Sequence, residues 1–168
     1  MEVAIKRGRQ GHWPEVLELY KLVAKTSGGL ARTREEISWE YVTNFLKKSE
    51  KTGLSLIATS GPTLVGEIHA YKLEPKVFSH VFAELTIAIH PEYQGKGVGR
   101  ALFTAFLEEI KTMRSEIARV ELIARESNKK AIEFYEKLGF RQEGKFEQRI
   151  DLGDGTFEAD IPMAWTRK

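Results

Sequence analysis

Residues 90–100 read HPEYQGKGVGR, and they join a predicted strand to a predicted helix. The residues before them, Glu84 to Ile89, are mostly branched and apolar, which is typical of a strand. After them, apolar residues recur at helical spacing from Ala101 to Ile110. Three glycines occupy alternate positions of the connection. The sequence therefore predicts a strand, a glycine-rich turn and a helix N-terminus in direct succession.

This turn has the properties of an anion-binding site. The first N–H groups of a helix lack partners within the helix, and the helix dipole adds partial positive charge there. Glycines let an anion approach the bare backbone. Lys96 and Arg100 add two full positive charges. We therefore expect a phosphate or pyrophosphate at this turn; the alternative is a glycine-rich connection without a ligand.

The spacing of the glycines narrows the choice of ligand. The Walker pattern requires Ser or Thr after Gly-Lys, whereas Gly97 follows Lys96 here. The dinucleotide fingerprint requires a third glycine where this chain has Arg100. The pattern Gln-x-x-Gly-x-Gly is met by Gln94, Gly97 and Gly99. It resembles the pyrophosphate-binding motif of the GNAT superfamily of acyl-CoA N-acyltransferases.

Composition limits the class of protein. The chain has 168 residues, 42% of them apolar, which suits one domain with a substantial core. With 26 basic and 24 acidic residues, its net charge of +2 argues against a general nucleic-acid or membrane binder. The absence of cysteine excludes disulfides and thiolate catalysis, and the histidines have no metal-ligand spacing, so we expect no metal. No apolar run approaches the ~20 residues of a membrane span, and the N-terminus does not resemble a signal peptide. We expect a cytoplasmic protein.

The remaining chain predicts alternating strands and helices. We expect a helix over Trp13 to Lys25 and a second helix that begins with Thr33 as N-cap and Glu36 in a capping box. Further patterns predict strands over 3–6, 54–59, 63–73, 80–89 and 119–125, helices from the glycine turn to about 112 and over 128–138, and a final hairpin of 140–152 with 157–165. This order predicts a single α/β domain over residues 1–168, with a mixed central sheet of about seven strands and helices on both faces.

A second motif strengthens the family resemblance. The pattern Asn-x-x-Ala-x-x-x-Tyr-x-x-x-Gly-Phe is met by Asn128, Ala131, Tyr135, Gly139 and Phe140. It resembles the second acyl-CoA motif of the GNAT superfamily, and it follows the first after one helix and one strand. The likeness extends over essentially the whole chain. The last segment also resembles small bacterial acetyltransferases of the amino-acid or antibiotic type.

The resemblance implies transfer of an acetyl group from acetyl-CoA, as acyl donor, directly to an amine. Such an enzyme aligns amine and thioester, stabilises the oxyanion and moves two protons. The resemblance assigns the oxyanion and cofactor contacts to backbone groups of Ile87, Ala88 and Ile89, with the Ile89 N–H as first choice. It assigns the pyrophosphate to the backbone of the turn, namely Gln94, Gly95, Lys96, Gly97, Val98, Gly99 and Arg100.

The second motif supplies two further site residues by resemblance. Asn128 would contact the pantetheine arm of the cofactor; as a helix N-cap it has a purely structural alternative, and it can serve as both. Tyr135 would contact the cofactor and act as general acid for the leaving thiolate, since a phenol with a pKa of about 10 is a suitable donor. Its alternative is a core aromatic residue beside Phe134.

The general base has several candidates. Strand alternation puts Glu84, Thr86, Ala88 and His90 on one face, and many members of the family have an acidic residue near the position of Glu84. Glu67 and His69 on the preceding strand are rivals. The alternative for Glu84 is a solvated strand residue without a catalytic role. An amine that reaches the site in its neutral form would need no general base.

Three functions follow. The first is an N-acetyltransferase for the primary amine of a small molecule, such as an amino acid or an amino-acid-like toxin, and Arg32 and Arg34 are candidates to pair with its carboxylate. The second is a protein N-terminal or lysine acetyltransferase. The third is a non-catalytic acyl-CoA-binding protein, which would be expected to lack Tyr135 or the turn glycines. The acceptor site should involve Ser27 to Arg32, Glu74 to Val81 and the final hairpin, and the family resemblance also suggests a homodimer.

Overall fold

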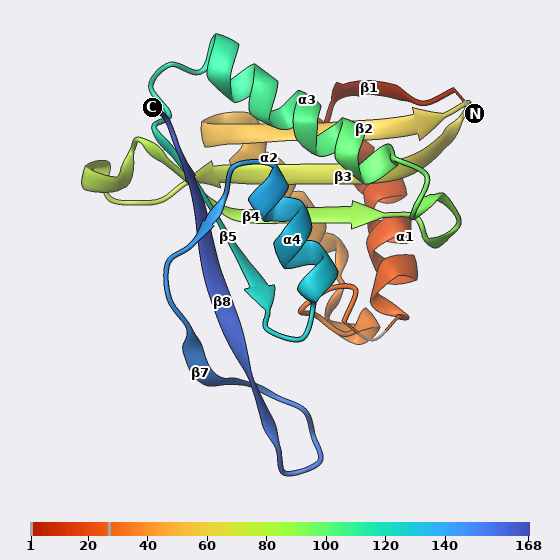
Figure 1. Ribbon diagram of the computed structural model, residues 1–168. Coiled ribbons are helices and arrows are strands. Elements are labelled where there is room, and N and C mark those ends of the chain that lie inside the picture. The colour runs from red at the N-terminus through yellow and green to blue at the C-terminus, as the bar shows by residue number, and fades with distance from the viewer. Residues whose placement is uncertain (1, 27) are drawn as a thin grey trace.

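The computed structural model describes residues 2–26 and 28–168. Over these residues the chain forms a mixed sheet of eight strands in the order β1-β2-β3-β4-β5-β8-β6, with β7 also paired to β8 (Figure 1). The strands are β1 Ala4–Arg7, β2 Gly53–Ser60, β3 Thr63–Lys72, β4 Val81–Ile89, β5 Arg119–Arg125, β6 Arg141–Gln142, β7 Phe146–Asp151 and β8 Phe157–Thr166. The predicted mixed sheet is confirmed. It has one strand more than expected because the segment predicted as one strand over 140–152 is divided into β6 and β7.

Helices cover both faces of this sheet, as predicted (Figure 1). They are α1 Trp13–Ala24, α2 Trp39–Thr52, α3 Val98–Met113 and α4 Lys129–Lys137. The apolar stripe of α3, including Phe103 and Phe106, is fully buried in one core cluster with residues of β2, β3 and β5. α1 and α2 form a second cluster on the opposite face. Within the described ranges, no helix combines the length and the apolar character that a membrane span requires.

The predicted start of the second helix is wrong. Thr33 and Glu36 do form the reciprocal capping box, with the Thr33 N–H donating to Glu36 Oε2 at 2.7 Å, but they cap only a 3-10 turn, Arg34–Glu36. Ile37 follows in an extended conformation and is buried, which ends that turn. Ser38 then caps α2 by accepting a hydrogen bond from the Tyr41 N–H at 3.1 Å. Two N-caps therefore lie close together, and the second one begins the helix.

The central strand β4 diverges from its parallel neighbour β5. The two strands pair only at Val81 with Arg119 and at Phe82 with Val120 (Figure 1). Just beyond this point the register between β3 and β4 shifts, and Glu84 adopts a φ of +56°. Such a bulge bends a strand and increases its twist. The second half of β4 is thereby separated from β5, which pairs along its whole length with β8.

Candidate active site

β4 presents an unpaired backbone edge after the divergence. The His90 N–H donates to the Val65 carbonyl of β3 at 2.9 Å. Because alternate residues of a strand direct their backbone groups to opposite sides, Ile87 and Ile89 direct theirs away from β3. On that side β5 has already diverged. The Ile87 and Ile89 N–H groups are therefore available to a ligand.

The adjacent side chains support this assignment. Gln94 donates from Nε2 to the Ile89 carbonyl at 3.0 Å, which places the Ile89 peptide groups on the open side and ties the glycine turn to the end of β4. Ala88 is placed differently from its neighbours. It pairs in register with Glu67 of β3, and its side chain is buried in the core cluster of α1 and α2. Its backbone therefore faces β3 and not the open edge.

The glycine turn combines open space with free donors. Gly95 and Gly97 have φ values of +71° and +84°, and a Cβ atom at either would meet nothing within 4 Å. α3 begins at Val98, and its first turn contains no acidic residue. Among the described residues, the backbone N–H groups of 95–100 have no acceptor. Lys96 and Arg100 are exposed beside them. This arrangement fits a diphosphate, which supplies the negative charge and the acceptor oxygens that the turn lacks.

Asn128 and Tyr135 belong to α4. Asn128 is the N-cap, since its Oδ1 accepts a hydrogen bond from the Ala131 N–H at 3.2 Å. The Tyr135 ring packs against Phe103 and Phe140 at centroid distances of 5.7 and 6.2 Å, and it belongs to the same core cluster as Ile87 and Ile89. Burial raises the pKa of Tyr135. The phenol therefore stays protonated at neutral pH, as a proton donor requires.

A cavity of about 400 Å³ adjoins β4 on the face covered by α1 and α2. Glu84 lies in its wall together with Arg32 and Lys48. The other lining residues come from the segment before α2, from α2 itself and from β3 and β4: Leu30, Ala31, Tyr41, Asn44, Phe45, His69, Tyr71 and Thr86. Part of the predicted acceptor segment, 27–32, is thus at this cavity, although Ser27 itself lies outside the described residues. Residues 74–81 and the final hairpin do not line it.

The two cations of this cavity lie against its aromatic rings. The Arg32 guanidinium lies 4.1 Å from the centroid of the Tyr41 ring, and Lys48 Nζ lies 5.2 Å from that of Tyr71. Burial raises the pKa of Tyr71, and the negative charge of Glu84 raises it further. The wall therefore carries two cations and one carboxylate.

A buried polar cluster lies behind the cavity wall. The Glu67 carboxylate accepts hydrogen bonds from the Tyr20 hydroxyl at 2.5 Å and from the Ser55 hydroxyl at 2.7 Å. His69 Nδ1 lies 3.0 Å from Glu67 Oε2. Burial and the negative charge of Glu67 raise the pKa of Tyr20 well above its ordinary value, so this hydroxyl stays protonated and donates. The sequence analysis named Glu67 and His69 as candidates for the general base but did not include Tyr20 and Ser55. The only signal for these two residues is a single polar atom on an otherwise apolar face.

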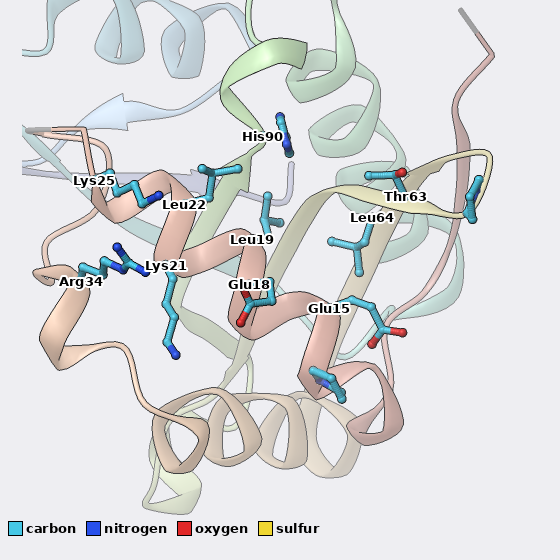
Figure 2. Close-up of a pocket in the computed structure, with 12 residues that line it drawn as sticks. Glu15, Glu18, Leu19, Lys21, Leu22, Lys25, Arg34, Thr63, Leu64 and His90 are labelled. Carbon is cyan, nitrogen blue, oxygen red and sulfur yellow. The ribbon is translucent and has the colours of Figure 1, made fainter.

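A second cavity, of about 550 Å³, lies between α1 and the turn from β2 to β3. Figure 2 shows three leucines, Leu19, Leu22 and Leu64, toward its middle, with Lys21, Lys25 and Arg34 on one side. Arg34 therefore lines this cavity, whereas Arg32 lines the cavity beside β4. The two arginines, both predicted as candidates to pair with a substrate carboxylate, lie at different cavities. His90 lies at the edge of this cavity, at the end of β4 (Figure 2).

Solved structures share this fold. The acetyltransferase of GNAT family from Streptococcus pneumoniae superposes with a TM-score of 0.87 at 21% identity, over 99% of this chain and 100% of that one. The yncA protein of Salmonella typhimurium, whose structure holds its cofactor acetyl-CoA, superposes with a TM-score of 0.83 at 16% identity, over 99% and 94% of the two chains.

Sequence relatives are similar over a shorter stretch. The [ribosomal protein bS18]-alanine N-acetyltransferase of Escherichia coli (strain K12) is 41% identical over 75 residues, which is 45% of this chain and 49% of that protein. The spermidine N(1)-acetyltransferase of the same strain is 39% identical over 84 residues, 50% of this chain and 44% of that protein. The matched stretch thus spans about half the length of either relative. The model of the acetyltransferase (GNAT) family matches residues 13–140 of this chain. This chain therefore belongs to the GNAT acetyltransferase family.

Proposed function

We propose that this chain is an acetyl-CoA-dependent N-acetyltransferase that acts on the primary amine of a small molecule, such as an amino acid or an amino-acid-like toxin. The observation that carries the proposal is the cavity beside β4, whose wall combines the Glu84 carboxylate with the Arg32 and Lys48 cations. A carboxylate attracts the ammonium form of an amine, and two cations attract a negatively charged group on the same molecule.

The cofactor site is proposed on the glycine turn and on α4. Acetyl-CoA supplies the thioester that is attacked and the diphosphate that anchors it. The free N–H groups of residues 95–100 would hold the diphosphate, with Lys96 and Arg100 beside it. Asn128 would contact the pantetheine arm while it caps α4. The proposal includes a single acyl-CoA N-acyltransferase domain over residues 1–168 and a cytoplasmic location.

The remaining groups would perform the transfer. The Ile89 N–H, with that of Ile87 nearby, would donate to the thioester oxygen as negative charge develops on it. The Tyr135 hydroxyl would protonate the leaving sulfur. Glu84 and His69 line the cavity, and either side chain would accept the proton of the amine. The products are an amide and free CoA thiol.

Cavity charge favours this substrate class over the alternatives. A polyamine carries only positive charge, and Arg32 and Lys48 would repel it. The volume of about 400 Å³ suits a small molecule better than a folded protein segment. A non-catalytic binding protein would have no need of the protonated hydroxyl that Tyr135 supplies.

Thiol release tests the proposal. The protein is mixed with acetyl-CoA and one of four amines: an α-amino acid, its carboxamide, spermidine or a short peptide with a free N-terminus. We expect thiol release with amino acids and at least about a tenfold lower kcat/KM with the carboxamides, because a charge-assisted hydrogen bond is lost. Preference for spermidine or for the peptide would overturn the assigned substrate class.

The two arginines provide a matched pair of variants. Arg32→Ala should raise the KM for an amino-acid substrate about 10- to 100-fold with little change in kcat, because a contact of about 1.5–3 kcal/mol is removed from bound substrate. Arg34→Ala should leave both constants unchanged, since Arg34 lines the other cavity. Steady-state kinetics measure both variants, and equal behaviour of the two would contradict the assignment.

A further inference from the structure

The polar cluster behind the cavity wall has no evident structural purpose. Glu67, Tyr20 and His69 are 0%, 0% and 2% exposed, and Ser55 is 3% exposed. Burying a carboxylate is costly, and a buried ionic pair is commonly no more stabilising than apolar side chains of the same volume. Buried ionisable groups that adjoin a cavity are instead typical of functional sites.

Hydrogen bonds of the cluster determine which nitrogen of His69 carries the proton. Both oxygens of Glu67 lie within reach of His69 Nδ1, at 3.0 and 3.2 Å. The same carboxylate already receives the hydroxyls of Tyr20 and Ser55. Because an ionised carboxylate can only accept, Nδ1 must be the protonated nitrogen of the neutral ring. The lone pair is then at Nε2.

The imidazole ring is held against the cavity. It stacks on Phe45 with a centroid distance of 3.9 Å and an interplanar angle of 10°. His69 pairs in register with Thr86 of β4, the residue directly before Ile87 and its open N–H group. The ring also lines the cavity together with Glu84. With Nδ1 held by Glu67, Nε2 is the polar atom that His69 offers to the cavity.

We propose that His69, oriented by Glu67, accepts the proton of the acceptor amine; this inference rests on the function proposed above. The amine nitrogen forms a bond to the thioester carbon as the carbon–sulfur bond breaks. The amine proton moves to His69 Nε2, and the Tyr135 proton moves to the sulfur. His69 then releases its proton to water and Tyr135 regains one from water. The Glu67 carboxylate stabilises the imidazolium formed in between.

Protonation of His69 should appear in the pH profile. A protonated ring cannot accept a proton, so kcat/KM should fall as pH decreases and the ring takes up a proton. Other charged or titratable groups face the ring from each neighbouring element: Tyr20 of α1, Tyr41 and Lys48 of α2, Glu67 and Tyr71 of β3, Glu84 of β4, and Arg32 of the segment before α2. The test must therefore separate His69 from Glu84.

Substitution of His69 by glutamine provides that test. His69→Gln should lower kcat at pH 7 by about 100-fold or more and remove the acidic limb of the kcat/KM profile. Its stabilisation by acetyl-CoA should match that of the wild type, which shows that it is folded. His80→Gln, in an exposed loop, is the control and should behave as wild type. The proposal would be overturned if His69→Gln kept the acidic limb and a kcat within a few-fold of the wild type. Loss of the limb in Glu84→Gln would then identify Glu84 as the base.

A measurement on the unaltered protein covers the case in which the variant does not fold. Long-range ¹H–¹⁵N NMR spectra report the imidazole tautomer. Spectra of the variants His12→Gln, His80→Gln and His90→Gln identify the signals of these three residues, and the remaining signal belongs to His69. We expect the Nδ1–H tautomer for His69 at high pH, and an Nε2–H tautomer would overturn the proposal. Failure of the proposed function is a different result, since the wild type would then release no thiol with any amine.

Discussion

Tyr135→Phe should lower kcat by about 100-fold or more, because it removes the proton donor for the leaving thiolate. The ring would still pack on Phe103 and Phe140, so the fold and the cofactor site should remain intact. Burial raises the pKa of Tyr135, so the wild-type hydroxyl stays protonated and kcat should show no basic limb below pH of about 10.

Two readouts keep this result separate from simple misfolding. Thermal stabilisation of Tyr135→Phe by acetyl-CoA should equal that of the wild type, whereas thiol release under saturating substrates should decrease. An unchanged kcat would show that Tyr135 is a core aromatic residue and that water or another group protonates the thiolate.

Gly97→Asp should abolish detectable binding of acetyl-CoA while the helix remains intact. Gly97 is the N-cap of α3, and aspartate is a favoured N-cap residue that tolerates a positive φ better than most. Its carboxylate would accept the N–H groups that we assign to the diphosphate and would repel that anion. Loss of two charge-assisted hydrogen bonds costs about 3 kcal/mol or more, which is over ~100-fold in affinity.

Gly153→Asp is the matched control for this variant. Gly153 also has a positive φ, +78°, and open space around a Cβ atom, but it lies in the turn between β7 and β8. Titration calorimetry with acetyl-CoA should give wild-type affinity for Gly153→Asp and no measurable heat for Gly97→Asp. Equal affinities in both variants would place the diphosphate elsewhere.

Local sequence patterns were sufficient for much of the fold. The glycine turn and the apolar stripe of α3 are adjacent in the chain, and the Asn128 cap lies one turn from the Ala131 N–H that donates to it. In β5, strand alternation puts Leu122 and Ile123 on opposite faces, and their side chains are 4% and 51% exposed. These features depend on neighbouring residues, so one sequence reveals them.

Features that depend on distant pairing were not predictable in this way. The bulge at Glu84 arises from the register of β3 against β4, and it directs the second half of β4 away from β5. The contact of Tyr20 with Glu67 depends on how α1 docks on the sheet. The start of α2 was misplaced because Thr33 supplies a complete capping signal, and only the burial of Ile37 shows that the turn ends there.

Binding of acetyl-CoA is the central claim, and thermal unfolding measures it most directly. The protein is heated alone and with acetyl-CoA, NADH or ATP at equal concentrations. A ligand at about 100 times its Kd stabilises the folded state by about 2.7 kcal/mol. We predict a rise in Tm that corresponds to this stabilisation with acetyl-CoA alone. No shift with saturating acetyl-CoA, or an equal shift with NADH or ATP, would contradict the account.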